Sequence, residues 1–239
     1  LLRSVFPEPS GQPSFKAGTY NGSQESPFEE RWGGWYVTGT HGGMRHMGNA
    51  IVTDHDRPRE MNRESGANLT DLSKKLDPSI YLEPGSDIVA LMVLQHQLKL
   101  HNLITLTNYQ AKLALQYAQE INKALGEPEG TISESTARRF QAPAEELLKY
   151  MLCVEEAPII DPIKGTSRFA QDFTARGPRD SRGRSLRDLD LNSRLLRYPC
   201  SYLIYSKSFE KLPPIVKTHI LKRLWEVLTG RDRSKTYAK

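Results

Sequence analysis

The chain has 239 residues, which is enough for one large domain or two small ones with a substantial hydrophobic core. Its formal net charge is +5, but 28 acidic residues are interspersed among 33 basic ones, so we expect no strong field of one sign and no nucleic-acid partner. No apolar run approaches the roughly 18 residues of a membrane-spanning helix, so we expect no membrane span.

The first part of the chain, residues 1–85, is predicted to be rich in loops. Its opening residues 1–6 lack the charged, apolar and small-residue order of a signal peptide, so we expect a processed or cut piece of a longer protein. Gly, Pro, Ser and Asn crowd this part without strand alternation or a helical stripe. Residues 32–40 combine aromatic and β-branched side chains between glycines, which predicts either a short strand, within a small sheet or β-hairpin, or an extended packing segment.

A long central helix is predicted to begin at Ser86, a good N-cap, with Asp87 in the first turn. Apolar residues then recur at helical spacing until Gly126, which favours a helix end. The polar cluster at 102–108 has poor helix propensity and predicts a kink or a break, so the element is either one helix or two in line. Apolar residues surround most of the first part, 88–106, which we therefore expect at the centre of the core.

Shorter helices are predicted to follow. One starts after Ser133 or Ser135, and Pro143 is expected to interrupt it and restart a shorter segment. Residues 165–190 have the composition of a solvated loop, and the last helix begins at Pro213 and Pro214 and ends before Gly230. The predicted fold class is mainly α: one long central helix, shorter packed helices in a helical core at 86–239, and the loop-rich part at 1–85.

Several familiar motifs are incomplete. The sequence Thr40-His41-Gly42-Gly43 is similar to an esterase oxyanion loop, but no GxSxG nucleophile elbow is present. The same glycines do not form a P-loop, because the required Lys and hydroxyl residue are missing. Cys153 and Cys200 form no CxxCH motif, so the chain cannot attach haem covalently by itself; they are either one disulfide or two small core residues.

Histidines are the candidate site residues. His41 and His46, near Glu30, are candidate acid–base catalysts, while His46 and His96 are candidate metal ligands. His96 and His101 lie about 140° apart on a helix and cannot easily share one metal, and no HExxH motif occurs. For each histidine the alternative is a neutral core residue bonded to the backbone.

The arginines of residues 165–190 form a second candidate site. They can bind an anion, a carboxylate or a haem propionate through bidentate contacts. The alternative is a solvated loop, which we favour because aspartates partly neutralise it and no aromatic residues are interleaved among the arginines from 176 to 187.

Five blocks of the sequence carry a resemblance to a known family. They are RSVFP at 3–7, SPFEERWGGWYVTGTHG at 26–42, HMGN at 46–49, SDIVALMVL at 86–94 and RYPCSYLIYS at 197–206, together with His96 and His101. The chain resembles the C-terminal part of an uncharacterised family of exported bacterial proteins. In that family an upstream region carries a single CxxCH motif for c-type haem.

The resemblance implies a periplasmic or otherwise exported redox protein, with haem c attached upstream of this chain. The partner is then the upstream haem-bearing region or a redox protein. The expected cofactor-binding residues are Arg31, Trp32, His46, Met47, His96 and His101. Two alternatives remain open: a haem-independent enzyme with a histidine-lined cleft, and a structural or protein-interaction module.

Overall fold

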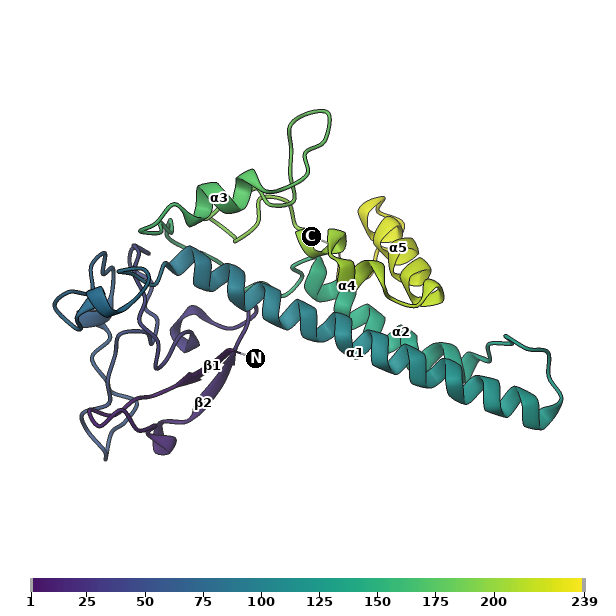
Figure 1. Ribbon diagram of the computed structural model, residues 1–239, viewed down its shortest axis with the longest axis horizontal. Helices are drawn as coiled ribbons and strands as arrows, with labels where there is room; N and C mark the ends of the chain where they lie inside the picture. Colours follow the sequence, from purple (N-terminus) through teal and green to yellow (C-terminus); the bar gives the residue numbers. More distant parts are fainter. Residues whose placement is uncertain (1, 238–239) are drawn as a thin grey trace. The chain divides into compact units, whose positions relative to one another are not determined.

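The computed structural model describes residues 2–237 and is mainly helical, which confirms the predicted fold class (Figure 1). The two strands are β1 (Leu2–Val5) and β2 (Thr19–Gly22). The helices are α1 (Ile88–Leu125), α2 (Glu134–Met151), α3 (Phe169–Ala175), α4 (Lys207–Glu210) and α5 (Pro214–Leu228). None of the helices within residues 2–237 is both long and apolar enough to cross a membrane.

The chain divides into two compact units, each built from two stretches of sequence. Unit 1 contains Leu1–Lys99 and Glu156–Tyr198, and unit 2 contains Leu100–Glu155 and Pro199–Lys239. The boundary lies inside α1, which therefore supplies its first turns to one core and its remaining turns to the other. The predicted division at residue 86 instead follows the change in sequence composition.

The small sheet lies in unit 1, but not where the sequence predicted it. Strands β1 and β2 pair antiparallel with Leu2 opposite Gly22. The segment at 32–40 forms no strand, so the expected hairpin there is wrong. Backbone conformation explains this, because Trp32 and Gly34 have positive φ angles of 62° and 79° that interrupt an extended chain. The Gly33 carbonyl instead accepts a 2.9 Å hydrogen bond from the Val5 N–H beside the sheet.

Helix α1 is one continuous helix of 38 residues, which decides between the two predicted alternatives. Its N-cap is Asp87 rather than Ser86: one carboxylate oxygen accepts from the N–H groups of Val89 and Ala90, at 2.8 and 3.2 Å. The polar cluster at 102–108 does not break it, because Thr107 is buried and donates to the Pro143 carbonyl at 3.1 Å.

Burial on several sides, predicted for 88–106, holds for the first turns of α1 but not beyond Leu100, where His101, Asn102, Thr105 and Leu106 are exposed. The buried residues occupy nearly every position of the first two turns rather than one stripe. They are Ile88, Val89, Leu91, Met92, Val93, Gln95, His96 and Leu100.

In unit 2, α2 begins at the Ser133 N-cap, which confirms the first of its two predicted starts. The expected interruption at Pro143 is wrong, because α2 continues through this residue to Met151. Helix α5 begins and ends where the two prolines and Gly230 predicted.

Cys153 and Cys200 are thiols rather than a disulfide, and burial raises the pKa of Cys200 to about 11.

An ion-pair network joins α2, α5 and the C-terminal segment within unit 2. The Arg223 guanidinium donates to Glu145 at 3.0 Å, to Glu226 at 2.8 Å and to Asp232 at 2.6 Å. Tyr237 donates its hydroxyl to Glu145 at 2.8 Å. The hydrogen bond from Arg223 lowers the pKa of Asp232 to about 2, so this carboxylate stays ionised across the physiological range.

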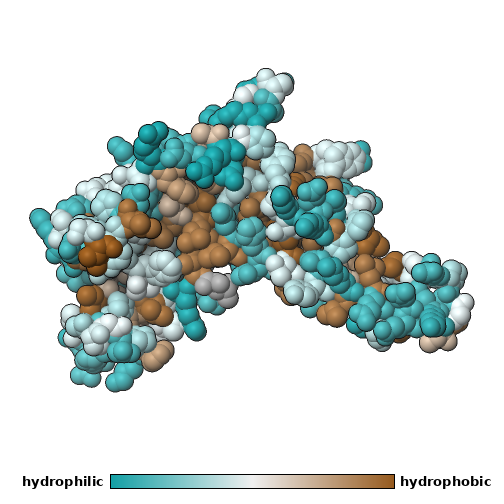
Figure 2. Space-filling view, in the orientation of Figure 1, coloured by the Kyte–Doolittle hydropathy of each residue, from teal (hydrophilic) through white to brown (hydrophobic). Residues whose placement is uncertain are grey.

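Unit 2 also presents apolar side chains to solvent along the second half of α1. In Figure 2, brown side chains are visible among the hydrophilic ones on the helices of this unit. The exposed apolar residues are Leu106, Tyr109, Leu113, Tyr117, Ile121 and Leu125. Their spacing of three or four residues places them along one side of the helix.

In unit 1, Asp87 joins three segments that are distant in sequence. Its second carboxylate oxygen accepts from both the N–H and the hydroxyl of Ser167, at 2.8 and 2.7 Å. The Thr38 N–H donates to the Ser86 carbonyl, and the Thr38 carbonyl accepts from Ile88. A Cβ atom at Gly165 would collide with the Asp87 carboxylate, so this close approach requires glycine.

We expect Asp87→Ala to lower the free energy of unfolding by about 2 to 4 kcal/mol, because it removes a helix cap and leaves both Ser167 donors unsatisfied. Urea denaturation followed by circular dichroism measures this change. Asp77→Ala is the matched control: Asp77 caps a single exposed turn at Pro78–Ile80, and its loss should cost about 1 kcal/mol or less. Equal losses in the two variants would contradict the joining role of Asp87.

Candidate functional site

The clearest candidate site is a cluster of four aromatic rings in unit 1, formed by Phe28, Trp32, His41 and His46. The two imidazole rings lie 4.7 Å apart between centroids, and the His46 ring lies 5.4 Å from Trp32. Phe28 contacts the other three rings at 5.3 to 5.9 Å. All four side chains are buried. The structure therefore brings together three of the predicted site residues, Trp32, His41 and His46.

Asn68 holds His41 in place. The Asn68 side chain accepts from the His41 N–H at 2.7 Å and donates to the Gly42 carbonyl at 2.9 Å. The Asn68 N–H donates to Nε2 of the His41 ring at 3.1 Å. Burial lowers the pKa of His41, so the ring is neutral at pH 7. A neutral ring that accepts at Nε2 carries its hydrogen on Nδ1, and this buried nitrogen has no partner with hydrogen-bond geometry, although the Met44 carbonyl opposes the lowering of the pKa.

His46 is also a buried, neutral imidazole. Only 3% of the surface of His46 is exposed to solvent. Burial, followed by the nearby His41, lowers the pKa of His46 to about 3, while the Gly48 carbonyl opposes this shift. Its Nδ1 atom is buried and lacks a partner with hydrogen-bond geometry. His46 therefore holds an uncharged ring at any pH above about 4.

Trp32 adds backbone strain to the cluster. Its φ angle of 62° lies in the left-handed region, which costs a bulky L-residue roughly 1 to 2 kcal/mol. Its indole Nε1–H is buried and has no hydrogen-bond partner. The cluster thus contains three buried nitrogens without partners, on Trp32, His41 and His46. Unpaired polar groups and strained backbone are features that folded proteins retain mainly where function requires them.

Arg31 borders the cluster, but its guanidinium is held by the backbone. Nε and Nη2 both donate to the Ser26 carbonyl, at 2.9 and 2.8 Å, and Nη2 also donates to the Gln24 carbonyl at 2.9 Å. The guanidinium lies 5.9 Å from the centre of the Phe28 ring. Because the residue is buried and committed to these carbonyls, it orders the loop that carries Phe28.

The other predicted cofactor-binding residues lie in different surroundings. Met47 packs in an apolar cluster with Phe6 and Val52. His96 is fully buried, and its Nδ1 is hydrogen-bonded to the Gln24 side chain, which fixes the hydrogen on that nitrogen. His101 is exposed on α1, in unit 2.

Sequence reasoning missed Phe28, Asn68 and Gln24, which complete this arrangement. The contacts that join them to the histidines span 13 to 72 residues, so no local spacing reveals these contacts. The available signal was weak: asparagine tolerates the left-handed conformation that Asn68 adopts, with φ of 52°.

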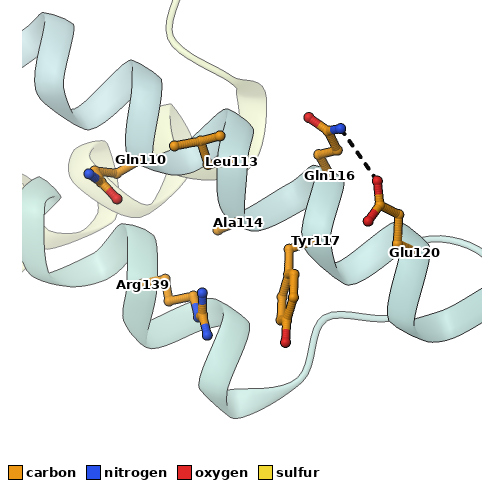
Figure 3. A pocket seen from close by; sticks show the side chains of 7 residues that line it. All are labelled: Gln110, Leu113, Ala114, Gln116, Tyr117, Glu120 and Arg139. Atoms are coloured by element: carbon orange, nitrogen blue, oxygen red, sulfur yellow. Dashed lines mark hydrogen bonds between the residues drawn. The ribbon is translucent and has the colours of Figure 1, made fainter.

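The two larger cavities among the described residues lie away from the aromatic cluster. One, of about 810 Å3 in unit 1, is lined by polar residues around the start of α1, including Asp87, Ser167 and Arg168. The other, of about 420 Å3 in unit 2, is shown in Figure 3. There the Arg139 guanidinium lies 4.8 Å from the centre of the Tyr117 ring, and Gln116 donates to Glu120. Arg168, one of the arginines of the second candidate site, lines the cavity in unit 1, and no predicted histidine lines either cavity.

Within residues 2–237 the structure contains no group of three or more His, Cys, Asp or Glu side chains arranged to hold a metal ion. Comparison of the chain with models of protein families, with curated proteins and with solved structures found no match. The candidate site therefore stands on its own geometry.

We expect the buried imidazoles to make the protein less stable as the pH falls. The unfolded chain protonates His46 near the ordinary pKa of about 6.5, whereas the folded chain does so only near 3. Between these values the unfolded state binds more protons, so the free energy of unfolding decreases with falling pH. His46 contributes about 1.4 kcal/mol per pH unit to this slope.

His46→Phe should remove that contribution while keeping a ring of similar size in the cluster. Urea denaturation at a series of pH values between 6.5 and 4 measures the slope. His101→Gln is the control, because His101 is exposed and no hydrogen bond or ion pair joins it to a described residue, so its loss should leave the slope unchanged. A His46→Phe variant with the slope of the parent protein would show that His46 is not buried and neutral.

Proposed function

We propose that this chain is a segment of an exported redox protein that packs against a c-type haem carried by an upstream region, with His46 facing the cofactor. The sequence resemblance supports the upstream haem. The observation that carries the assignment to His46 is its buried, neutral ring with an unpartnered Nδ1, because iron and other transition metals bind neutral imidazole through a nitrogen lone pair.

The other candidate ligands fit a haem less well. The Nε2 atom of His41 already accepts a hydrogen bond from Asn68, so its lone pair is engaged. Met47 has its side chain in an apolar cluster, and Arg31 donates to carbonyls instead of being available to a propionate. Among the described residues the Nδ1 atom of His46 lacks a partner with hydrogen-bond geometry, and the Gly48 carbonyl is the one backbone group that raises the pKa of this ring.

The surrounding residues have separate tasks in this proposal. The haem supplies one-electron chemistry when it is bound. Phe28 and Trp32 pack on the His46 ring, which limits its rotation and excludes water. Asn68 and His41 lie behind the His46 ring. Because the His41 ring is neutral, it places no positive charge beside His46. A dry, apolar setting of this kind is one of the means by which proteins adjust redox potential.

The absorption spectrum of the full-length natural protein tests this proposal. We expect a Soret band in the full-length protein. His46→Ala and His46→Met should each change the position of the band or the midpoint potential, whereas His55→Ala should change neither. Absence of the band from the full-length protein would refute the haem assignment. A band and potential unaffected by both His46 variants would refute the role of His46.

The alternative of a protein-interaction module is favoured by a different observation, the exposed apolar residues along one side of α1 in unit 2. Acid–base catalysis by His41 and His46, with Glu30, draws less support. Efficient general bases have pKa values near the working pH, whereas burial lowers both of these pKa values.

A further inference from the structure

A second feature of unit 1 is a basic loop at residues 175–187, which we call the arginine loop. It holds five arginines and one aspartate, so its formal charge is +4, compared with +5 for the whole chain. In Figure 1 the loop follows α3 and extends away from that helix, and in Figure 2 this projection is strongly hydrophilic. The arginines are Arg176, Arg179, Arg182, Arg184 and Arg187. The arginine loop is therefore a local concentration of positive charge, partly offset by Asp188, which pairs with Arg179.

The arginine loop is ordered by its own aspartate. Asp180 accepts hydrogen bonds from the N–H groups of Arg182 and Arg184, each at 2.9 Å, and from Nε of Arg184 at 2.7 Å. The Asp180 N–H donates to the Arg184 carbonyl, and its carbonyl accepts from Gly183. Arg179 donates to the Gly183 carbonyl at 2.6 Å. The loop is thus a closed turn whose backbone is fixed by six short-range hydrogen bonds.

This turn leaves two guanidinium groups available. Arg179 is paired with Asp188, and Arg184 with Asp180. The side chains of Arg176 and Arg182 have no hydrogen bond or ion pair to any described residue, and both residues are exposed. Each therefore presents all five of its N–H donors to solvent on an ordered backbone. Such preorganisation reduces the entropy lost when a partner binds.

We propose that the arginine loop docks onto a carboxylate-rich surface of a protein partner, with Arg176 and Arg182 making the contacts. The planar guanidinium matches a carboxylate in a bidentate pair, and the loop uses arginine throughout with no lysine. This inference is independent of the haem, because it rests on the arginine loop alone.

The composition of the loop favours a protein over other anionic partners. No aromatic residue lies within 175–187 to stack on bases, as a single-stranded nucleic acid would require. The loop also lacks an exposed large apolar side chain that would enter a lipid surface. Asp180 lies in the middle of the turn, which suits a partner with discrete carboxylates better than a continuous polyphosphate.

Binding of the purified protein to an immobilised poly-glutamate peptide tests this proposal. Arg176→Gln combined with Arg182→Gln should weaken binding about fivefold or more. Lys74→Gln combined with Lys75→Gln is the matched control, because it removes the same charge from exposed residues of unit 1; it should change binding less than about twofold. Equal effects of the two double variants would overturn the proposal, since binding would then depend on net charge alone.

Asp180→Asn separates geometry from charge. It raises the net charge by one, so a purely electrostatic attraction would bind poly-glutamate more tightly. It also weakens the acceptor that closes the turn, so we expect weaker binding. Tighter binding would overturn the proposal.

Two other anionic partners are tested at the same salt concentration: vesicles that contain phosphatidylserine, and duplex DNA. The proposal would also be overturned if the protein bound the vesicles or the DNA more tightly than poly-glutamate, and if the Arg176 and Arg182 double variant lost that binding.

Discussion

The hydrogen bonds of Asp87 are the constraint on which unit 1 depends. One carboxylate oxygen caps α1 and the other holds Ser167, while the neighbouring backbone pairs with Thr38. Thr40 in turn pairs with Lys164 through two hydrogen bonds of 2.9 Å. The segment 38–40, which precedes His41, is therefore held by hydrogen bonds to the start of α1 and to Lys164, both of which lie far away in sequence. Removing one partner of such a junction leaves several buried donors unsatisfied, which costs more than a single hydrogen bond contributes.

The aromatic cluster lies at the end of this fixed segment and gathers in one place departures that elsewhere in unit 1 occur singly, as at Gln95, Glu156 and Leu191. Trp32 has a left-handed backbone, and three buried nitrogens lack partners. An apolar core of the same volume would avoid each of these costs. Local departures of this kind concentrate at functional sites. For this reason the cluster, rather than either cavity, is the stronger candidate, although a cavity is the more usual place for a ligand.

The sequence predicted the elements whose signals are local, and failed where distant contacts decide. The two prolines and Gly230 located α5, and helical spacing located α1. Poor propensity at 102–108 and at Pro143 did not break α1 or α2, and the Thr107 hydroxyl of α1 donates to the Pro143 carbonyl of α2, a contact that local propensity does not include. The hairpin was misplaced because positive φ angles at Trp32 and Gly34 are invisible in the composition. The pairing of His41 with His46 was expected, but Phe28 and Asn68 join them from other parts of the chain.

The same distinction applies to charge. Interspersed acidic and basic residues predicted no field of one sign, and for the chain as a whole that expectation is reasonable. Screening acts over about 10 Å at ordinary salt concentration, so a partner responds to the charges near its contact rather than to the total. In the arginine loop Asp180 lies close to four guanidinium groups in sequence, but its oxygens are turned toward the loop's own N–H groups. An aspartate used in this way organises the basic surface more than it neutralises it, and this effect cannot be read from counting charges.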